Sequence, residues 1–371
     1  MLKSIVSLLL IFLLAALSVY SISFVLPTLA SLYGRSVYFT VPMSWIGGAI
    51  GGVLLSMLAD RWSRRMSLLI SIFLFTIPLI MNIAIRELPL LYLIWFIIGF
   101  GVNGENGLSY AYAAELAPPR YRGLVGSLMQ GLYFIGGLIG LIWAILFKNV
   151  NAYFLSLGLI SCLSFALWFL IPESRWRNRS YRGSTSRDLI RTVILGSIFA
   201  VGSFLFIVPL VSLSFTVLSM LKVDSFLILS IALILGMISF TLAGRVSDSL
   251  GRKKTTFVFV AISIVFSIVM LVSLNSILIA LTIIALMIGS SFFAYFGVWM
   301  SEVFPPETRA TWTNAVFFLG RLVGGGFGVS LVLLMPFGLK DDLGAALLIS
   351  SLLVLISVIG LPETVKINKR N

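Results

Sequence analysis

Two ionisable residues of this chain stand inside long apolar stretches. Glu105 lies ten residues before Glu115, and Arg321 lies twelve residues after Arg309. At a helical rise of 1.5 Å per residue, both are about 15 to 18 Å from the charged ends of their stretches, and an ionisable group at that depth indicates a functional site. Glu105 can hold a proton or bind hydroxyls or amines, and Arg321 can hold a carboxylate or neutralise Glu105. The alternative for each is a permanent structural pair or a contact to backbone carbonyls.

Polar and aromatic residues supply further candidates for contact with a solute. Asn103 and Asn106 flank Glu105 in a glycine-broken segment, and segments of this kind line cavities between apolar helices. The amide of Gln130 can donate to and accept from hydroxyls, and it needs partners in an apolar helix. Tyr295 and Trp299 stand four residues apart and can pack on a sugar or another amphipathic solute. Packing or lipid contact is an equal alternative for these two aromatic residues.

Three charged segments occur twice in the chain at nearly one spacing. Residues 114–123 return as 301–310, 187 residues later, and both copies place a glutamate seven residues before an arginine with Pro-Pro between them. The matched pairs are Glu115 with Glu302, Arg122 with Arg309, Asp60 with Asp248, and Pro172-Glu173 with Pro362-Glu363. Ordered matches near half of the chain length predict a duplicated, two-lobed protein.

The elements that position these residues are apolar helices. Of the 371 residues 60% are apolar and 11% are charged, which is more apolar surface than a soluble globule can bury. Twelve windows are long enough to cross a membrane, at 4–31, 37–59, 66–85, 89–116, 122–147, 151–171, 190–215, 224–246, 255–275, 277–302, 309–336 and 343–361. The sequence therefore predicts an all-α integral membrane protein, with twelve transmembrane helices in two pseudo-symmetric six-helix bundles. The bundles are expected at 1–171 and 190–371, joined by a cytoplasmic linker at 172–189.

Positive charges indicate the orientation of these helices. With both termini in the cytoplasm, twenty Lys and Arg residues fall in cytoplasmic segments and five in outer loops, which favours that orientation in the cell membrane. The net charge of +13 then reflects topology and lipid headgroups rather than nucleic acid. One cysteine and no histidine leave no cluster for a metal, so any proton transfer must use carboxylates. No segment outside the membrane is large enough for a catalytic domain, so we expect neither an enzyme nor a cofactor.

A charged loop in the second half resembles a motif of a known family. Gly244-x-x-x-Asp248-x-x-Gly251-Arg252-Lys253 is similar to the loop that major facilitator superfamily transporters carry between their second and third helices and repeat between the eighth and ninth. The first copy has Ser56 and Ser63 in place of glycines, and it keeps Asp60, Arg61, Arg64 and Arg65. The resemblance covers the whole chain, and it implies a two-lobed fold that transports by alternating access.

Within that superfamily the chain is similar to the sugar porters and to related metabolite and organic-ion symporters. The sugar-porter pattern is followed at Glu115, Arg122, Gly123, Gly126, Ser127 and Gln130, and its Pro-Glu-Ser and Pro-Glu-Thr elements at 172–174 and 362–364. Three features depart from it: Asn103 replaces a glycine, the segment 207–210 lacks the paired sugar-binding glutamines, and the first helix has no acid. Residues 302–326 look more like the metabolite and organic-ion branch, so sugar is one candidate substrate among others.

The repeated charges at the cytoplasmic helix ends predict a gate between the lobes. A helix that starts after Pro-Pro presents unpaired amides, which a carboxylate from a neighbouring helix can bind. The symmetry suggests that Asp60 meets the start of the eleventh helix and Asp248 the start of the fifth, in contacts that close the cytoplasmic side. The alternative is charge that only fixes topology. The predicted cytoplasmic gate comprises Asp60, Arg61, Arg64, Arg65, Glu115, Arg122, Glu173, Asp248, Arg252, Lys253, Glu302, Arg309 and Glu363.

Together these patterns predict a secondary active transporter that moves a small polar metabolite, either a sugar or an organic acid or ion. Proton symport is favoured over uncoupled facilitation because Glu105 is a deeply placed carboxylate. A drug or metabolite exporter of the same fold and a transporter-like solute sensor are the alternatives. The expected partners are a small-molecule substrate, protons and membrane lipids, without nucleic acid, and the expected state is a monomer.

Overall fold

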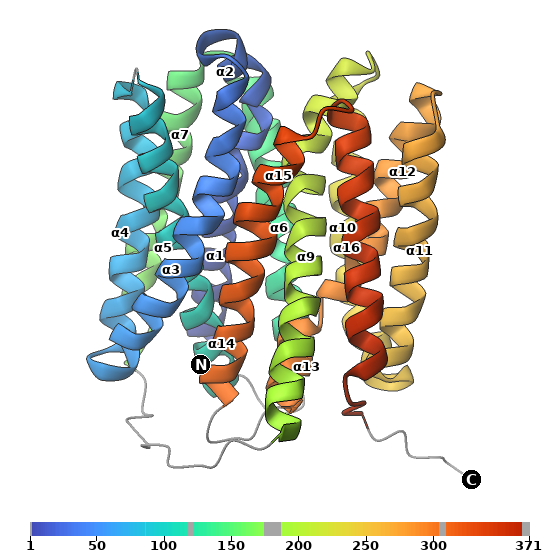
Figure 1. Ribbon diagram of the computed structural model, residues 1–371. Helices are drawn as coiled ribbons and strands as arrows, with labels where there is room; N and C mark the ends of the chain where they lie inside the picture. Colours follow the sequence, from blue (N-terminus) through green and yellow to red (C-terminus); the bar gives the residue numbers. More distant parts are fainter. Residues whose placement is uncertain (1, 86, 117–121, 174–186, 304–308, 366–371) are drawn as a thin grey trace.

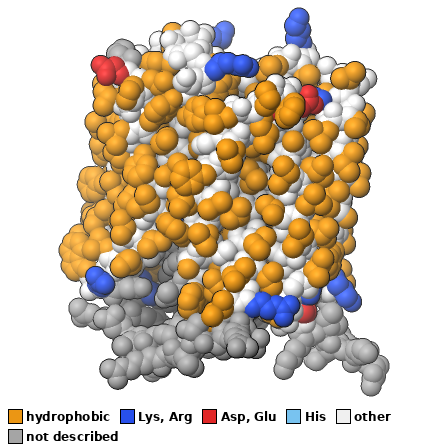
Figure 2. All heavy atoms as spheres, in the orientation of Figure 1, with side chains coloured by type: hydrophobic (Ala, Val, Ile, Leu, Met, Phe, Trp, Pro, Cys, Tyr) orange, Lys and Arg blue, Asp and Glu red, His pale blue; other side chains and the backbone are white. Residues whose placement is uncertain are grey.

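The computed structural model describes residues 2–85, 87–116, 122–173, 187–303 and 309–365. Within these residues every regular element is helical, and twelve segments are long and apolar enough to cross a membrane. The number of spans predicted from the sequence is therefore confirmed. The helices stand side by side (Figure 1). Hydrophobic side chains cover the flank of the molecule, while Lys and Arg lie toward its two ends (Figure 2).

The first half of the chain supplies six of these spans and is called the N-lobe here. Its α-helices are α1 (Leu2–Tyr20), α2 (Leu26–Tyr33), α3 (Thr40–Arg61), α4 (Arg64–Met81), α5 (Leu88–Leu116), α6 (Arg122–Leu146), α7 (Val150–Ser161) and α8 (Leu163–Trp168). Short 3-10 turns lie at η1 (Ser21–Phe24), η2 (Arg35–Phe39) and η3 (Asn82–Ala84). Side-chain oxygens of Ser63 and Asn149 accept from the first amides of α4 and α7, because those amides have no partner within the helix.

The second half supplies the other six spans and is called the C-lobe. Its elements are α9 (Arg187–Met220), α10 (Ser225–Leu250), α11 (Arg252–Val272), α12 (Ser276–Gly289), η5 (Ser290–Phe293), α13 (Phe296–Val303), α14 (Arg309–Leu319), η6 (Gly320–Gly328), α15 (Val329–Leu334) and α16 (Leu339–Gly360). Asn275 caps α12 as Asn149 caps α7. The two lobes thus begin corresponding helices with the same residue type. We propose the boundaries 1–171 and 190–371 for the lobes; most of the expected linker lies outside the described residues.

Six predicted windows are not single α-helices, and three of them contain a 3-10 or π segment away from their ends. The window 4–31 contains the 3-10 turn η1, the window 277–302 contains η5, and the window 309–336 contains the nine-residue π-helix η6. Five of the nine residues of η6 are glycine, the residue that stabilises an α-helix least apart from proline. Because π segments occur mostly at functional sites, η6 marks the part of the eleventh span to examine, and it carries Arg321.

The most extensive contacts between the lobes are those of α3 with η6 and of α6 with α10, and smaller ones join α3 with α14 and η1 with α9. Glycine permits the close approach of η6, since a Cβ added to Gly326 would lie 2.5 Å from Cγ1 of Ile46 on α3. Within the N-lobe, α3 packs on α5 as tightly, since a Cβ on Gly99 would lie 1.7 Å from the carbonyl oxygen of Ser44. These close contacts bring side chains of α3, α5 and η6 to one place between the lobes.

Candidate substrate site

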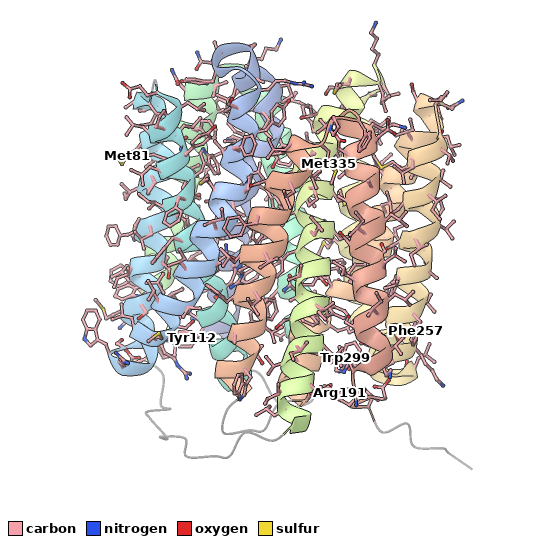
Figure 3. The ribbon with its side chains drawn as sticks, viewed as in Figure 1. Met81, Tyr112, Arg191, Phe257, Trp299 and Met335 are labelled. Carbon is pink, nitrogen blue, oxygen red and sulfur yellow. The ribbon has the colours of Figure 1, made fainter. Side chains whose placement is uncertain are left out.

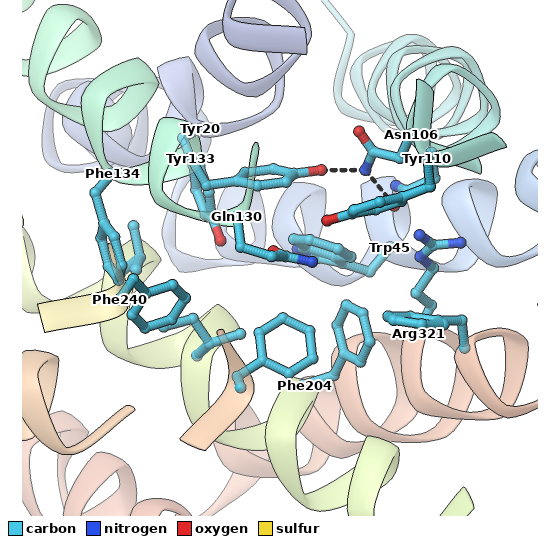
Figure 4. Close-up of a pocket in the computed structure, with 15 residues that line it drawn as sticks. Tyr20, Trp45, Asn106, Tyr110, Gln130, Tyr133, Phe134, Phe204, Phe240 and Arg321 are labelled. Atoms are coloured by element: carbon cyan, nitrogen blue, oxygen red, sulfur yellow. Dashed lines mark hydrogen bonds between the residues drawn. The ribbon is translucent and has the colours of Figure 1, made fainter. Parts of the chain in front are cut away.

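A cavity lies between the lobes at mid-helix positions (Figure 4). Its lining residues are Tyr20, Trp45, Asn103, Asn106, Tyr110, Gln130, Tyr133, Phe134, Phe204, Ile207, Val211, Phe240, Phe293, Phe317 and Arg321. The cavity volume is about 30 Å³, which is room for about one or two water molecules. The lobes are therefore nearly closed on each other here, and a metabolite enters only after they move apart.

The two lobes contribute unlike walls to this cavity. The uncharged polar side chains all come from the N-lobe and form what we call the polar wall: Tyr20, Asn103, Asn106, Tyr110, Gln130 and Tyr133. The C-lobe contributes what we call the aromatic wall: Phe204, Phe240, Phe293 and Phe317, with Ile207 and Val211. Among the lining residues Arg321 is the single charged one, and it stands on the C-lobe side. A bound solute would thus meet hydrogen-bonding groups on one side and hydrocarbon on the other.

Helix α5 presents three members of the polar wall. Asn103, Asn106 and Tyr110 are spaced three and four residues apart, which places them on one helix face. The amide nitrogen Nδ2 of Asn103 donates to the Gly99 carbonyl at 3.1 Å, and that of Asn106 donates to the Tyr133 hydroxyl of α6. Oδ1 of Asn106 is buried and has no partner among the described residues. This face therefore holds a buried acceptor that no described residue satisfies.

Arg321 reaches the cavity from the π-helix η6 without a counter-charge. It is 7% exposed, and no ion pair or hydrogen bond joins it to any other described residue. Its guanidinium carbon lies 5.9 Å and 5.4 Å from the ring centres of Phe204 and Phe317, so the aromatic wall holds the cation against ring faces. A Cβ on Gly52 of α3 would lie 2.7 Å from Nη1 of Arg321. The guanidinium thus reaches across to the N-lobe at a position that glycine keeps open.

Glu105 does not line the cavity, unlike the two asparagines beside it. It lies about 200° around α5 from Asn103, fully buried inside the N-lobe. The Ser109 hydroxyl donates to its Oε1, while its Oε2 has no partner among the described residues. No ion pair joins Glu105 to Arg321 within the part of the chain that the structure describes. The expected alternative in which Arg321 neutralises Glu105 in the empty state is therefore not seen.

Tyr295 and Trp299 do not line the cavity. Trp299 lies toward the end of the molecule that carries the N-terminus (Figures 1 and 3). The Tyr295 hydroxyl is 2.8 Å from the Thr256 hydroxyl, and Trp299 Nε1 donates to the Pro362 carbonyl at 3.0 Å. Both side chains are fully buried among C-lobe helices. These hydrogen bonds within the C-lobe indicate that Tyr295 and Trp299 stabilise its packing, so we do not retain them as substrate contacts.

Charges at the same end of the C-lobe form a compact cluster around Arg252. Its Nη2 lies 2.6 Å from Oδ1 of Asp248 and 2.9 Å from Oε1 of Glu302. Glu363 accepts from the backbone amides of Arg252 and Lys253 at 2.9 and 3.0 Å, and so caps α11. Burial raises the pKa of Glu363, but the backbone hydrogen bonds outweigh it and hold that pKa below its ordinary range. All of these contacts lie within the C-lobe.

The N-lobe shows a looser version of this arrangement. Glu173 accepts from the hydroxyl of Ser63, the residue that caps α4. The guanidinium of Arg65 lies 4.2 Å from the ring centre of Trp168, which in turn donates to the Arg65 carbonyl. Arg61 is exposed at the end of α3, and Arg64 begins α4. The carboxylates Glu173 and Glu363 thus stand at matching helix starts, beside Ser63 before α4 and at the first amides of α11.

The predicted contacts between the lobes at this end involve side chains that lie outside the described residues. These are the side chains of Asp60, Glu115, Arg122 and Arg309. The described ion pair of Asp248 is with Arg252 of its own lobe. The pairing of Asp60 and Asp248 with helices of the opposite lobe therefore stays a prediction.

The aromatic wall and the tyrosines of the polar wall were not predicted from the sequence. Phenylalanine occurs 29 times in the chain, so its presence in an apolar helix marks no site. The helical period offered one usable signal: Tyr110 follows Asn103 by seven residues and Tyr133 follows Gln130 by three, which places each pair on one face. Four of the predicted site residues, Asn103, Asn106, Gln130 and Arg321, do line the cavity.

Comparison with known proteins places this geometry in context. The family model described as "Major Facilitator Superfamily" matches residues 8–329. A protein of Cupriavidus pinatubonensis described as a probable 4-methylmuconolactone transporter is 27% identical over 92% of this chain and 86% of its own length. The inner membrane metabolite transport protein YhjE of Escherichia coli is 24% identical over 80% and 76%. The crystal structure of a D-xylose-proton symporter superposes with a TM-score of 0.79 over 98% of both chains, at 18% identity, a likeness of fold alone.

Proposed function

Because the chain belongs to the major facilitator superfamily, a transporter family, we propose that it carries a small organic anion across the cell membrane together with a proton. Its relatives are named as transporters of sugars or other metabolites, and the chain is a transporter of that type rather than an enzyme. We infer that it works as a monomer by alternating access, with both termini in the cytoplasm. The anionic substrate and the proton are the finer part of this proposal.

The observation that carries the anionic substrate is Arg321, which has no ion pair among the described residues. A guanidinium buried in a cavity without a counter-ion is costly, and that cost favours an anion that enters the site. Its planar fork of donors binds a carboxylate through two parallel hydrogen bonds. The cation stands in the cavity between the lobes, where each lobe motion would change its exposure. A neutral sugar would leave this charge uncompensated.

Glu105 is the residue that we propose to carry the proton. It is fully buried and lacks a cationic partner among the described residues, so an ionised carboxylate there would be costly in the membrane interior. We infer that the carboxyl takes up its proton when the anion binds to Arg321, and releases it when the lobes open to the opposite side. One anion on Arg321 and one proton on Glu105 make the loaded carrier electrically neutral relative to the empty one.

The test is uptake into proteoliposomes that contain the purified full-length chain. An organic monoanion should accumulate when the outside is more acidic, and an imposed membrane potential at equal pH should not drive uptake, because no net charge moves. Uptake of neutral sugars without anion uptake contradicts the anionic substrate. Anion uptake that equilibrates without response to the pH gradient identifies an uncoupled facilitator, and binding without flux identifies a solute sensor.

A further inference from the structure

The proposed function does not say which chemical group carries the carboxylate of the substrate. The different chemistry of the two cavity walls indicates what that group is. We propose that the substrate is a carboxylate attached to a flat, unsaturated or aromatic ring, with a hydrogen-bonding oxygen at the far edge of that ring. This inference rests on the proposed function, since it assumes that Arg321 holds the carboxylate. It adds the chemistry that the remaining lining residues select.

The first argument is the composition of the aromatic wall. Apart from Arg321, the C-lobe lining is hydrocarbon, with Phe204 and Phe317 beside the cation and Phe293 and Phe240 further along. A polyhydroxylated ring has hydroxyls around its whole edge, and those that face this wall would lose water without gaining a partner. A flat hydrocarbon ring loses nothing there and gains apolar contact. The wall therefore selects against sugars and sugar acids.

The second argument is the way aromatic side chains close the cavity between the lobes. The rings of Trp45 in the N-lobe and Phe204 in the C-lobe lie 5.4 Å apart at 63°, and those of Phe134 and Phe240 lie 4.7 Å apart at 86°. Both pairs bridge the lobes in edge-to-face contacts. When the lobes part these contacts are lost, and a flat ring between the walls replaces them with ring contacts on both faces. A saturated ring is thicker and lacks the charge distribution that favours such contacts.

The third argument is the position of Arg321 relative to the ring faces. Its guanidinium carbon is within 6 Å of the centres of both Phe204 and Phe317. A carboxylate bonded directly to an unsaturated ring lies in the plane of that ring, so a two-point pair with Arg321 aligns the ring with its neighbours in the aromatic wall. A carboxylate on a flexible chain would form the same ion pair without this alignment. The ion pair with Arg321 and the ring contacts with the aromatic wall thus favour the same orientation of one rigid ligand.

The fourth argument is the polar wall opposite Arg321. Gln130 and Tyr133 lie across the cavity from Phe204 (Figure 4). The Gln130 amide can both donate and accept, and Asn106 keeps a buried oxygen without a partner among the described residues. A hydroxyl or carbonyl at the far edge of the ring would use these groups. The site therefore favours a ring that carries its two polar ends on opposite edges.

A ligand panel on the detergent-solubilised wild-type chain tests this inference. The probes are 4-hydroxybenzoate, benzoate, cyclohexanecarboxylate and glucuronate, and the readout is the dissociation constant from calorimetry. We expect 4-hydroxybenzoate and benzoate to bind about tenfold more tightly than cyclohexanecarboxylate, the ratio that a favourable aromatic contact gives. Glucuronate should bind most weakly. Equal or tighter binding of cyclohexanecarboxylate or glucuronate overturns the ring proposal and leaves the anion proposal standing.

Two variants connect the preference to the aromatic wall. Phe204→Leu should reduce the ratio between benzoate and cyclohexanecarboxylate to about threefold or less, because it removes one ring contact and keeps the apolar volume. Phe257→Leu, on the exposed side of α11, is the matched control and should leave the ratio unchanged. An unchanged ratio in Phe204→Leu counts against the wall as the selective element. If no carboxylate binds at all, the failure lies with the proposed function.

Discussion

The polar wall and the aromatic wall come from corresponding halves of one duplicated chain, yet they share almost no chemistry. The N-lobe lines the cavity with amides and phenols beside Trp45 and Phe134, whereas the C-lobe lines it with phenylalanines, Ile207, Val211 and one arginine. At one end of the molecule the halves have stayed alike, since Glu173 and Glu363 stand at the starts of α4 and α11. Where the halves only hold and reorient helices, the repeated residues remain. Where they face the cavity, the repeat has been replaced by two different surfaces.

Among the tests of the difference between the two walls, removal of the charged residue on the C-lobe side, Arg321, should have the largest effect. In Arg321→Gln a carboxylate loses its charged partner, and binding of benzoate should weaken by at least about 30-fold, as expected for a truncated buried ion pair. Arg191→Gln, an exposed position at the start of α9, is the control and should bind like wild type. Calorimetry gives both constants. A benzoate affinity that is unchanged in Arg321→Gln rules out the assigned carboxylate site.

A substitution behind the polar wall should separate binding from coupling. In Glu105→Gln the side chain keeps its shape and cannot exchange a proton, so benzoate binding should stay within about twofold of wild type. A gradient of one pH unit drives up to about tenfold accumulation of a proton–anion pair, and we expect this accumulation to disappear in the variant. Exchange of labelled for unlabelled benzoate should continue. Full pH-driven accumulation in Glu105→Gln would show that another group carries the proton.

The parts of the site that could be predicted from the sequence are those whose residue type is costly in a membrane. Arg321, Asn103, Asn106 and Gln130 stand out because charges and amides in apolar helices need a reason, and all four line the cavity. Glu105 stood out equally, but its phase on α5, between the two asparagines, turns it away from the cavity.

The remaining misassignments follow from interrupted helices and common residue types. The turn η5 separates Tyr295 and Trp299 from α12, so a regular helical period does not continue through the window 277–302. The aromatic wall uses a residue type that is plentiful in the whole chain, and it is assembled from the separate C-lobe elements α9, α10, η5 and α14. The fold class and the number of spans can be predicted from composition. Which side chains face each other across the cavity depends on contacts between segments far apart in the sequence.

A smaller change tests whether the aromatic wall depends on support from the other lobe. In Gly52→Ala the added Cβ meets Nη1 of Arg321 at 2.7 Å, and the flexible guanidinium must shift to accommodate it. We expect benzoate to bind about three- to tenfold more weakly with little change in thermal stability. Gly131→Ala is the matched control, because its Cβ would meet its nearest neighbour at an ordinary 3.5 Å. Equal affinities in the two variants contradict a contact of Arg321 with α3.

The smallest effect concerns the end of the molecule where the lobes resemble each other. The pKa of Glu363 is held below its ordinary range by backbone amides at the start of α11, against the opposing effect of burial. Its ionised form therefore stabilises the folded state near neutral pH, and this stabilisation is lost as the pH falls through the lowered pKa. Because the side chain is partly exposed, Glu363→Gln should lower the midpoint of thermal unfolding by only about 1 to 3 °C at neutral pH. The difference from wild type should shrink in acid.

The counterpart in the N-lobe sharpens this last comparison. In the N-lobe the Ser63 side chain itself caps α4 and donates to Glu173, whereas Gly251 before α11 has no side chain that could cap it. Part of the capping therefore remains in Glu173→Gln, which should change the midpoint less than Glu363→Gln does. Glu87→Gln, at an exposed position before α5, serves as the control for loss of one surface charge. The midpoints of thermal unfolding of the three variants, measured at acidic and neutral pH, show which substitution destabilises the fold most. A larger effect at Glu173 than at Glu363 would mean that the hydroxyl contact, and not the helix cap, is the stronger of the two. The helix starts of the two lobes would then differ in how much their carboxylates stabilise the fold, just as the two cavity walls differ in chemistry.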